Sequence, residues 1–247
     1  MEIHMENPKP LKFISVNIEK HRHVDRVLSF LGNENPDVIC FQEILGDDFP
    51  TFLEATGFKG TFVPMARFPL KLDVDKDTVI SGIATISRFP MEMETHYYYG
   101  SPDFVPDFIH ADQTTNNRML LVSKLNHNGK KFIIGNTHFT WTPNGEMDEW
   151  QRKDISSLMN IMQKFPEIIL CGDMNAPRGR ETFDIFASKY KDNIPVSCTT
   201  TIDKNLHIAG DLQYVVDALF TTPKYEAKNV RLQDGVSDHM AVVAELF

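Results

Sequence analysis

Short β-rich runs alternate with segments of helical period along this chain, and this alternation constrains the fold more than any other feature of the sequence. Residues 11–18 (LKFISVNI) have the composition of a strand. Apolar residues then recur at the i, i+3, i+4, i+7 spacing of one helix face (Val24, Val27, Leu28 and Leu31). We expect Gly32 to end this helix and residues 37–41 to form a second strand. Such alternation is typical of layered α/β or α+β architectures.

The later segments follow the same pattern and contain many strands. Asn128-Gly129 lies between two β-rich runs, residues 118–125 and 131–141, and Asn-Gly tolerates the positive φ angles of a tight hairpin turn. We therefore expect these two runs to pair antiparallel. Helices are also expected at residues 47–57, 155–162 and 183–190, and strands at residues 59–65, 78–89, 167–171, 214–220, 227–232 and 240–247. So many strands exceed one comfortable sheet, which favours two packed sheets with helices outside.

The composition is that of one globular domain. No composition shift or Ser/Gly-rich linker divides the 247 residues, so we expect a single domain over residues 11–247 and a disordered N-terminal extension over residues 1–10. Hydrophobic residues make up 42% of the chain and charged residues 24%, which excludes a disordered, collagen-like or coiled-coil protein.

The charge balance limits the partners. The chain has 25 Lys and Arg against 34 Asp and Glu, a formal net charge of -9, so any contact with nucleic acid has to be local. No apolar run approaches the roughly 18 residues of a membrane helix, and the first ten residues lack the apolar core of a secretory signal. Three cysteines, two of them inside apolar runs, fit buried thiols in a reducing compartment. We expect a cytoplasmic monomer without a membrane span.

Polar groups end or interrupt the hydrophobic runs at five places, and an α/β scaffold usually displays its chemistry at such strand ends. They are Asn17 with Glu19, Glu43, His138, Asp173 with Asn175, and Asp238 with His239. Each also has an ordinary structural explanation: a turn cap for Asn17, a solvated strand end for Glu43, a core position for His138 and a capped strand start for Asp238-His239.

The pair Asp173 and Asn175 follows the buried run of residues 168–172. In an extended segment the i, i+2 spacing points both side chains to one side, where they could orient a water or a metal ion. The alternative is an Asx turn that closes the strand, which the following Pro177 favours.

The collection is more informative than its parts. Carboxylates, amides and two histidines without paired cysteines favour a hard cation, Mg²⁺ or Mn²⁺, over zinc. Such a cation takes its remaining ligands from water and phosphate oxygens and neutralises charge during in-line attack. The polar groups therefore indicate phosphate chemistry.

Six motifs occur in a recognisable order: SVNIE at residues 15–19, FQE at 41–43, NTHF at 136–139, CGDMN at 171–175, VDALF at 216–220 and SDH at 237–239. In this order and spacing they resemble the endonuclease/exonuclease/phosphatase superfamily, the DNase I-like fold, over essentially the whole chain. The resemblance implies a four-layer sandwich of two mixed sheets with helices on the outer faces, and a divalent-metal phosphoesterase site on one rim.

The resemblance also implies a metal side of the site. Glu43 matches the principal metal ligand, and Asn17 matches a residue that orients both phosphate and metal. Asp238 corresponds to a metal-side carboxylate. Glu19 stands where many members have Asp, and we expect it to be a further metal ligand.

A catalytic side follows in the same way. Asp173 would activate or align the attacking water, and Asn175 would hold phosphate or water. His138 would contact the scissile phosphate or assist the leaving group, and His239 would stabilise or protonate a phosphoryl oxygen. We expect Asp217 to hydrogen-bond His239, because a carboxylate on one ring nitrogen fixes the tautomer and raises the basicity of the other. An unpaired Asp217 inside its apolar run would be costly; the alternative is that it faces solvent on a strand edge.

Substrate evidence is sparser. Arg118, which opens a strand, is the best candidate among the basic residues for binding a substrate phosphate. Aromatic residues such as Tyr97, Tyr98, Tyr99, Trp141 and Trp150 could stack a base or sugar, although packing is their commoner role.

The resemblance fixes the reaction better than the substrate. We predict a Mg²⁺-dependent phosphodiesterase that uses in-line attack of an activated water on a phosphoester substrate. The alternatives are a nuclease acting on nucleic-acid ends or lesions, and a phosphatase acting on inositol phosphate or lipid head groups. A binding module without activity is disfavoured because no motif position is missing.

Overall fold

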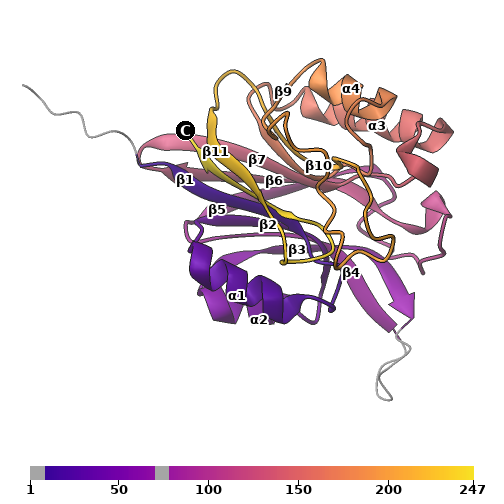
Figure 1. Ribbon diagram of the computed structural model, residues 1–247, viewed down its shortest axis with the longest axis horizontal. Helices are drawn as coiled ribbons and strands as arrows, with labels where there is room; N and C mark the ends of the chain where they lie inside the picture. The colour runs from indigo at the N-terminus through magenta and orange to yellow at the C-terminus, as the bar shows by residue number, and fades with distance from the viewer. Residues whose placement is uncertain (1–8, 70–77) are drawn as a thin grey trace, which may run out of the picture.

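The computed structural model, which describes residues 9–69 and 78–247, consists of two sheets packed face to face (Figure 1). In the first sheet the described strands are ordered β11-β12-β1-β2-β4-β3, with bounds Ala227–Gln233, Ala241–Leu246, Leu11–Asn17, Val38–Leu45, Thr78–Ser87 and Lys59–Pro69. In the second sheet the order is β5-β6-β7-β8-β10-β9, with bounds Met91–Tyr99, Arg118–His127, Lys130–His138, Ile169–Asp173, Asp217–Thr221 and Lys191–Asp192. Each sheet combines parallel and antiparallel pairs.

Helices cover the outer faces of both sheets. Helices α1 (Val24–Glu34) and α2 (Phe49–Thr56) lie beneath the first sheet, and α3 (Glu149–Met162) and α4 (Glu181–Ala187) lie over the second (Figure 1). Two short 3₁₀ helices, η1 (Gln113–Thr115) and η2 (Pro143–Gly145), lie in connections of the second sheet. The expected four-layer sandwich is therefore confirmed.

A buried apolar layer joins the two sheets. It combines Phe13 and Val38 of the first sheet with Phe132, Ile169 and Leu219 of the second. Burying a side chain of this size stabilises a protein by about 1.5–3 kcal/mol, so this layer fixes the two sheets against each other. It also fixes the strand ends, where the polar motifs lie.

The expected hairpin is present. Strands β6 and β7 pair antiparallel, with Asn128 at φ 49° and Gly129 at φ 77° between them. This is the conformation that a two-residue turn of primed type requires. Strand β7 ends at His138, three residues earlier than expected.

The expected end of one helix was wrong, and one long strand was missed. Helix α1 continues through Gly32 to Glu34, and Asn35 ends it in the left-handed conformation at φ 48°. Gly32 lies on the exposed face, where glycine costs about 1 kcal/mol, while burial of Phe30 and Leu31 stabilises that part of the helix. Strand β5 was not expected, because its alternation of charged and partly buried residues is that of a polar edge strand.

Most of the expected N-terminal extension, residues 1–8, lies outside the described residues. In the two described ranges, every helix is too short or too polar to cross a membrane.

Candidate active site

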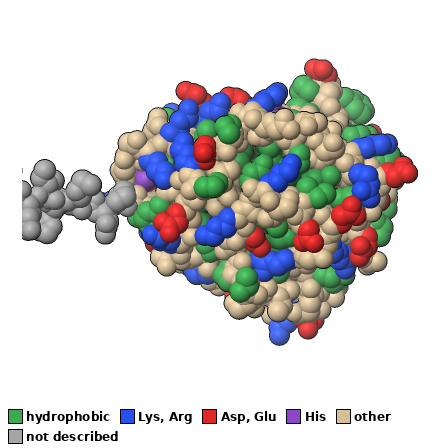
Figure 2. All heavy atoms as spheres, turned by 90° about the horizontal axis from the view of Figure 1, so that it is seen from above, with side chains coloured by type: hydrophobic (Ala, Val, Ile, Leu, Met, Phe, Trp, Pro, Cys, Tyr) green, Lys and Arg blue, Asp and Glu red, His purple; other side chains and the backbone are tan. Residues whose placement is uncertain are grey.

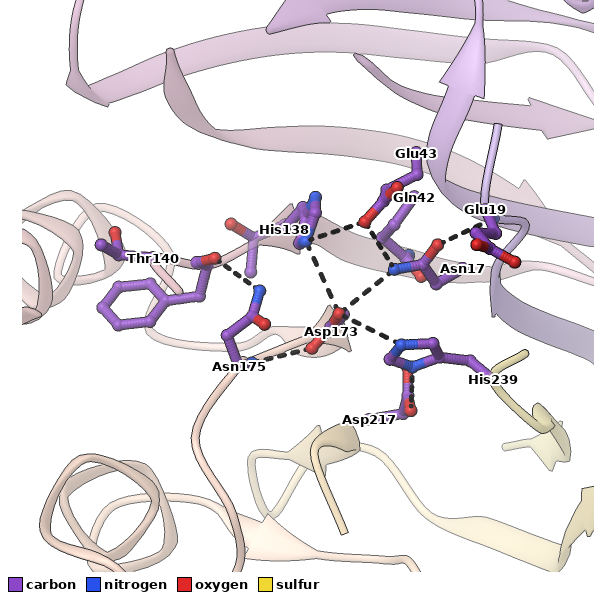
Figure 3. A network of polar contacts seen from close by, with 12 residues as sticks. Asn17, Glu19, Gln42, Glu43, His138, Thr140, Asp173, Asn175, Asp217 and His239 are labelled. Atoms are coloured by element: carbon purple, nitrogen blue, oxygen red, sulfur yellow. Dashed lines mark hydrogen bonds and ion pairs between the residues drawn. The ribbon is translucent and has the colours of Figure 1, made fainter. Parts of the chain in front are cut away.

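The candidate residues lie at one end of the sandwich, where central strands of both sheets terminate (Figure 3). Strand β1 ends at Asn17, β7 at His138 and β8 at Asp173. Strand β10 runs antiparallel to β8 and begins at Asp217, which pairs with Asp173. His138 pairs with Asp173 on the other side of β8. Strand register therefore brings together side chains that are far apart in the sequence.

The expected bond between Asp217 and His239 is present. Nδ1 of His239 lies 2.8 Å from Oδ2 of Asp217, and both residues are buried. Nε2 of the same ring lies 3.8 Å from Oδ2 of Asp173. Burial alone would lower the pKa of His239, but the carboxylates of Asp217 and Asp173 raise it well above the usual value. The ring is therefore held as an imidazolium between two carboxylates.

Asp173 occupies the centre of the network. Its Oδ1 accepts a hydrogen bond of 2.8 Å from the backbone N–H of Asn175, and its Oδ2 accepts one of 3.2 Å from Nδ2 of Asn17. Burial raises the pKa of Asp173, an effect that His239 opposes and the neighbouring Asp217 carboxylate reinforces. Asp173 is thus a carboxylate of increased basicity at the point where the two sheets meet.

The segment Asp173–Asn175 is not extended, contrary to the expectation from its i, i+2 spacing. Asn175 has φ 47°, and its N–H bond to Asp173 closes the Asx turn that was the alternative. Its Nδ2 donates to the carbonyl of Phe139 at 2.9 Å. This turn still places Asn175 on the wall of the cavity described below.

His138 faces two carboxylates. Its Nε2 lies 3.5 Å from Asp173 Oδ2 and 3.9 Å from Glu43 Oε1. Burial lowers the pKa of His138, and the carboxylates of Asp173 and Glu43 offset this only in part. The two buried histidines of the site, His138 and His239, are therefore shifted in opposite directions, which is how a site separates a neutral imidazole from a charged one.

Glu43 lies at an irregularity of β2 between Phe41 and Ile44. It has φ 54°, a left-handed conformation that costs a non-glycine residue about 1–2 kcal/mol and is common at functional sites. Its Oε1 accepts a 3.4 Å hydrogen bond from Asn17, and its Oε2 lies 2.5 Å from Lys20 Nζ. Burial would raise the pKa of Glu43, but Lys20 and His138 hold it far below the usual value. Glu43 is therefore ionised.

Glu19 and Asp238 form a separate group. Oxygens of these two carboxylates and a ring nitrogen of His23 lie within 4.8 Å of one another. Glu19 also binds His23 at 3.1 Å and Arg22 at 2.6 Å. The four residues expected on the metal side are thus divided between Glu43 with Asn17 and Glu19 with Asp238, and His23 was not anticipated.

Lys20 connects these two groups. Burial would lower the pKa of the Lys20 ammonium, but the carboxylates of Glu43, Glu19 and Asp238 raise it above the usual value. Negative potential from three carboxylates therefore converges on one cation position. Oxygen donors of this kind suit a hard divalent cation, and the buried thiols Cys40 and Cys171 lie in the layer between the sheets instead. The residues present fit the expected metal.

A second cluster of ligand atoms has the same spacing. Ligand atoms of Asp173, Asp217 and His239 also lie within 4.8 Å of one another. Both ring nitrogens of His239 face a carboxylate there, and Nδ1 is already bonded to Asp217. This arrangement is suited to holding a proton, so we favour Glu43 and its neighbours for the cation.

Arg118 is buried at the start of β6. Its Nη1 donates to the carbonyl oxygens of His138 and Phe139 at 3.1 and 3.0 Å, and its Nε has no partner among the described residues. The guanidinium therefore holds the backbone that carries His138. Arg118 also reaches the wall of the cavity, so contact with a substrate phosphate stays a prediction.

Two amide side chains, to which the sequence motifs gave no role, connect the two sheets behind the site. Gln42 donates through Nε2 to Oδ1 of Asn136 at 2.7 Å, and Asn136 donates to the carbonyls of Phe41 and Ala84. These bonds cross from one sheet to the other directly behind Glu43 and His138. The sequence signal was present, because both amides interrupt apolar strands next to a motif residue.

A cavity of about 310 Å³ opens beside these groups. Lys20, Glu43, His138 and Asn175 line it, so the charged and hydrogen-bonding groups of the site are accessible from it.

Comparison with known proteins identifies relatives over most of the chain. The model of the "Endonuclease/Exonuclease/phosphatase family" matches residues 14–239. The chain is 24% identical over 207 residues to the CCR4-Not complex 3'-5'-exoribonuclease subunit Ccr4 of Schizosaccharomyces pombe, covering 66% of this chain and 30% of that protein. It is 30% identical over 162 residues to nocturnin of Mus musculus, covering 62% and 35%. The chain thus spans about a third of the length of these curated relatives.

Solved structures share the fold. An endonuclease/exonuclease/phosphatase from Bacteroides vulgatus superimposes with a TM-score of 0.72 at 19% identity, covering 96% of this chain and 98% of that one. The human nocturnin catalytic domain with bound sulfate anion gives 0.71 at 20% identity, covering 97% and 93%.

Proposed function

Because this chain belongs to the endonuclease/exonuclease/phosphatase family, we propose that it is a Mg²⁺- or Mn²⁺-dependent phosphodiesterase. The observation that carries the proposal is the linked set Asp217, His239 and Asp173, placed within reach of His138 and Glu43 at the end of both sheets. Phosphoester hydrolysis needs an aligned water, stabilisation of the phosphoryl oxygens and protonation of the leaving oxygen, and this set contains groups for each.

Asp173 aligns the attacking water and accepts its proton, because burial makes it more basic than an ordinary aspartate. The bond from the water oxygen to phosphorus forms as the bond to the leaving oxygen breaks. His239, oriented by Asp217, donates a hydrogen bond from Nε2 at the phosphoryl group and transfers this proton to the leaving oxygen. Asn175 and His138 contact the phosphate from the cavity wall.

Glu43 would hold the divalent cation together with Asn17, and Asp238 and Glu19 would add charge from the neighbouring group. A bound cation supplies charge neutralisation at the phosphate. Asn17 fixes the position of both Glu43 and Asp173 through its two hydrogen bonds. The protein contributes the geometry in which the water, the phosphate and the leaving oxygen lie in line.

A nuclease acting on nucleic-acid ends is the second hypothesis, because the fission yeast relative is named as a 3'-5'-exoribonuclease subunit. The charge argues against non-specific binding of duplexes: on the face that Figure 2 shows, Lys and Arg lie scattered among acidic and apolar side chains. A phosphatase for inositol phosphate or lipid head groups remains the alternative among small substrates.

A substrate panel tests the proposal. The chain is assayed with Mg²⁺, with Mn²⁺ and with EDTA on a generic diester, single-stranded RNA, abasic and nicked DNA, 5'-phosphotyrosyl DNA, an inositol phosphate and sphingomyelin. We expect cation-dependent release of product from at least one diester. His127→Ala, on the hairpin at the far end of β6, is the control for His239→Ala. Absence of turnover on every substrate would make the chain a binding module and overturn the proposal.

A further inference from the structure

One wall of the cavity is apolar and adjoins the reacting groups, because Lys20, which pairs with Glu43, also lies over the Phe68 ring, with Nζ 4.8 Å from the ring centroid. Phe68 and Phe108 stack at 4.4 Å between ring centroids with 26° between their planes, and Met65 lies beside them on the same lining. Trp141 is 40% exposed and lies 5.7 Å from the ring of His110. A group attached to a phosphate at Glu43 and His138 would therefore lie against flat, apolar side chains.

This wall is built into the fold. The connection between β5 and β6 is joined to β3 by two backbone bonds of 2.8 Å, from Phe108 N–H to the Arg67 carbonyl and from Arg67 N–H to the Pro106 carbonyl. Arg67 also pairs with Asp107 at 2.8 Å. These contacts hold the rings in place before any ligand binds, which lowers the ordering cost of binding.

Asn116 gives the wall a polar feature without a partner. Asn116 is only 7% exposed and lines the cavity. Its Oδ1 has no hydrogen-bond donor among the described residues. Most buried side-chain polar atoms have a partner, so an unpaired amide oxygen on a residue of a cavity wall indicates a site that a ligand completes. This oxygen is fully buried, so a ligand donor reaches it only if the side chain turns toward the cavity.

The size of the cavity limits what can bind. At about 310 Å³ it lies at the lower end of the range for small-molecule sites, which is enough for one nucleoside-sized group. A polyol such as inositol lacks a flat apolar face, and a choline head group has no N–H to offer Asn116. A nucleobase has both a flat face for Trp141 or the Phe68–Phe108 pair and N–H donors on its edge.

Building on the proposed function, we propose that this cavity binds one nucleobase, so that the substrate presents a single unstacked nucleotide next to the scissile phosphate. Trp141 and the two phenylalanines contact the face of the base, and Asn116 accepts a hydrogen bond from its edge. The nucleotide is either free or the terminal one of a single strand, since both present the same chemistry to the cavity.

The two tryptophans of the chain allow a test that needs no catalysis. Trp150 lies on α3 against Tyr99 and is not part of the cavity lining, so Trp150→Phe leaves Trp141 as the only tryptophan reporter. This variant is titrated in EDTA with adenosine and cytidine, and with myo-inositol and phosphocholine as controls. We expect saturable quenching of Trp141 by a nucleoside and none by the controls.

Two further variants separate the contacts from a folding defect. Trp141→Ala and Asn116→Leu are measured by calorimetry with the same nucleoside, and their thermal unfolding is recorded. From the strength of base stacking we expect Trp141→Ala to weaken binding about 5-fold or more. Trp150→Ala is the matched control and should bind as the native chain does. Equal affinity of Trp141→Ala and native protein would overturn the proposal.

A comparison of substrates distinguishes a free nucleotide from the terminal nucleotide of a single strand. It also tests the base site separately from the phosphodiesterase activity. Adenosine monophosphate and a short single-stranded oligonucleotide are compared, and preference for either supports the base site. Hydrolysis of a simple diester without saturable nucleoside binding would overturn this inference and leave the proposed function standing. Nucleoside binding without hydrolysis of any diester would overturn the proposed function and leave this inference standing.

Discussion

The two walls of the cavity differ in how their polar groups are satisfied. On the catalytic wall, Glu43 is bonded to Asn17 and Lys20, and Asn175 is bonded to Asp173 and to the carbonyl of Phe139. On the apolar wall Oδ1 of Asn116 has no partner among the described residues, and Trp141 keeps a large exposed area. Groups that take part in chemistry are thus held in position by the protein itself, whereas groups that select a ligand are left for the ligand to satisfy.

The largest expected effect is that of removing the catalytic imidazole. His239→Ala should lower kcat/KM on the best panel substrate by about 10³-fold, because a positioned acid or base contributes about 10²–10⁴-fold. Steady-state kinetics with thermal unfolding is the measurement, and His127→Ala should retain full activity. A loss smaller than tenfold with an intact fold would remove His239 from the mechanism.

The second effect concerns the cation. Glu43→Gln keeps the size of the side chain and removes the charge, so the Mg²⁺ concentration for half-maximal activity should rise by about 10-fold or more. Calorimetric titration with Mn²⁺ gives a readout independent of turnover. Glu54→Gln, on the exposed face of α2, is the control. Unchanged Mn²⁺ affinity in Glu43→Gln would exclude Glu43 as a ligand.

A smaller loss is expected from the positioning residue. Asp217→Asn should lower kcat by about 10²-fold, with KM and thermal stability little changed, because the ring of His239 remains but is misoriented.

A double variant tests whether Asp217 and His239 act as one catalytic unit. Asp217→Asn combined with His239→Ala should be little worse than His239→Ala alone, since both changes disable the same group. Multiplicative losses would show that the two residues act independently.

Much of the candidate site was predictable from the sequence, because its residues end or interrupt apolar strands. Asp217 shows why: its charge lies between Val216 and Ala218 on a buried strand, so a partner was required. The layers of the fold followed from the alternation of elements for a similar reason, since each apolar face has to be covered. Even so, the polar edge strand β5 lacked the apolar signal on which such predictions depend.

The remaining features depend on local backbone geometry. Glu19 and Lys20 both adopt positive φ angles, 46° and 63°, and no residue of that turn is the glycine that would have signalled it. That turn directs Glu19 to His23 and leaves Lys20 to bind Glu43. Arg118 shows a role that the sequence did not indicate: it starts β6 between β5 and β7, where its buried side chain bonds the carbonyls of His138 and Phe139.

The smallest expected effect tests the apolar wall of the cavity on its own. If Trp141 only contacts the base, Trp141→Ala should raise KM for a nucleotide diester by about 5–10-fold and leave kcat within about twofold, because stacking is present equally in the ground and transition states. The same variant should hydrolyse a methyl diester as the native chain does, since that substrate has no base to stack. Trp150→Ala should change neither KM nor kcat. A fall in kcat on both substrates would place Trp141 among the groups that position the phosphate, and the division between the two walls would then be wrong.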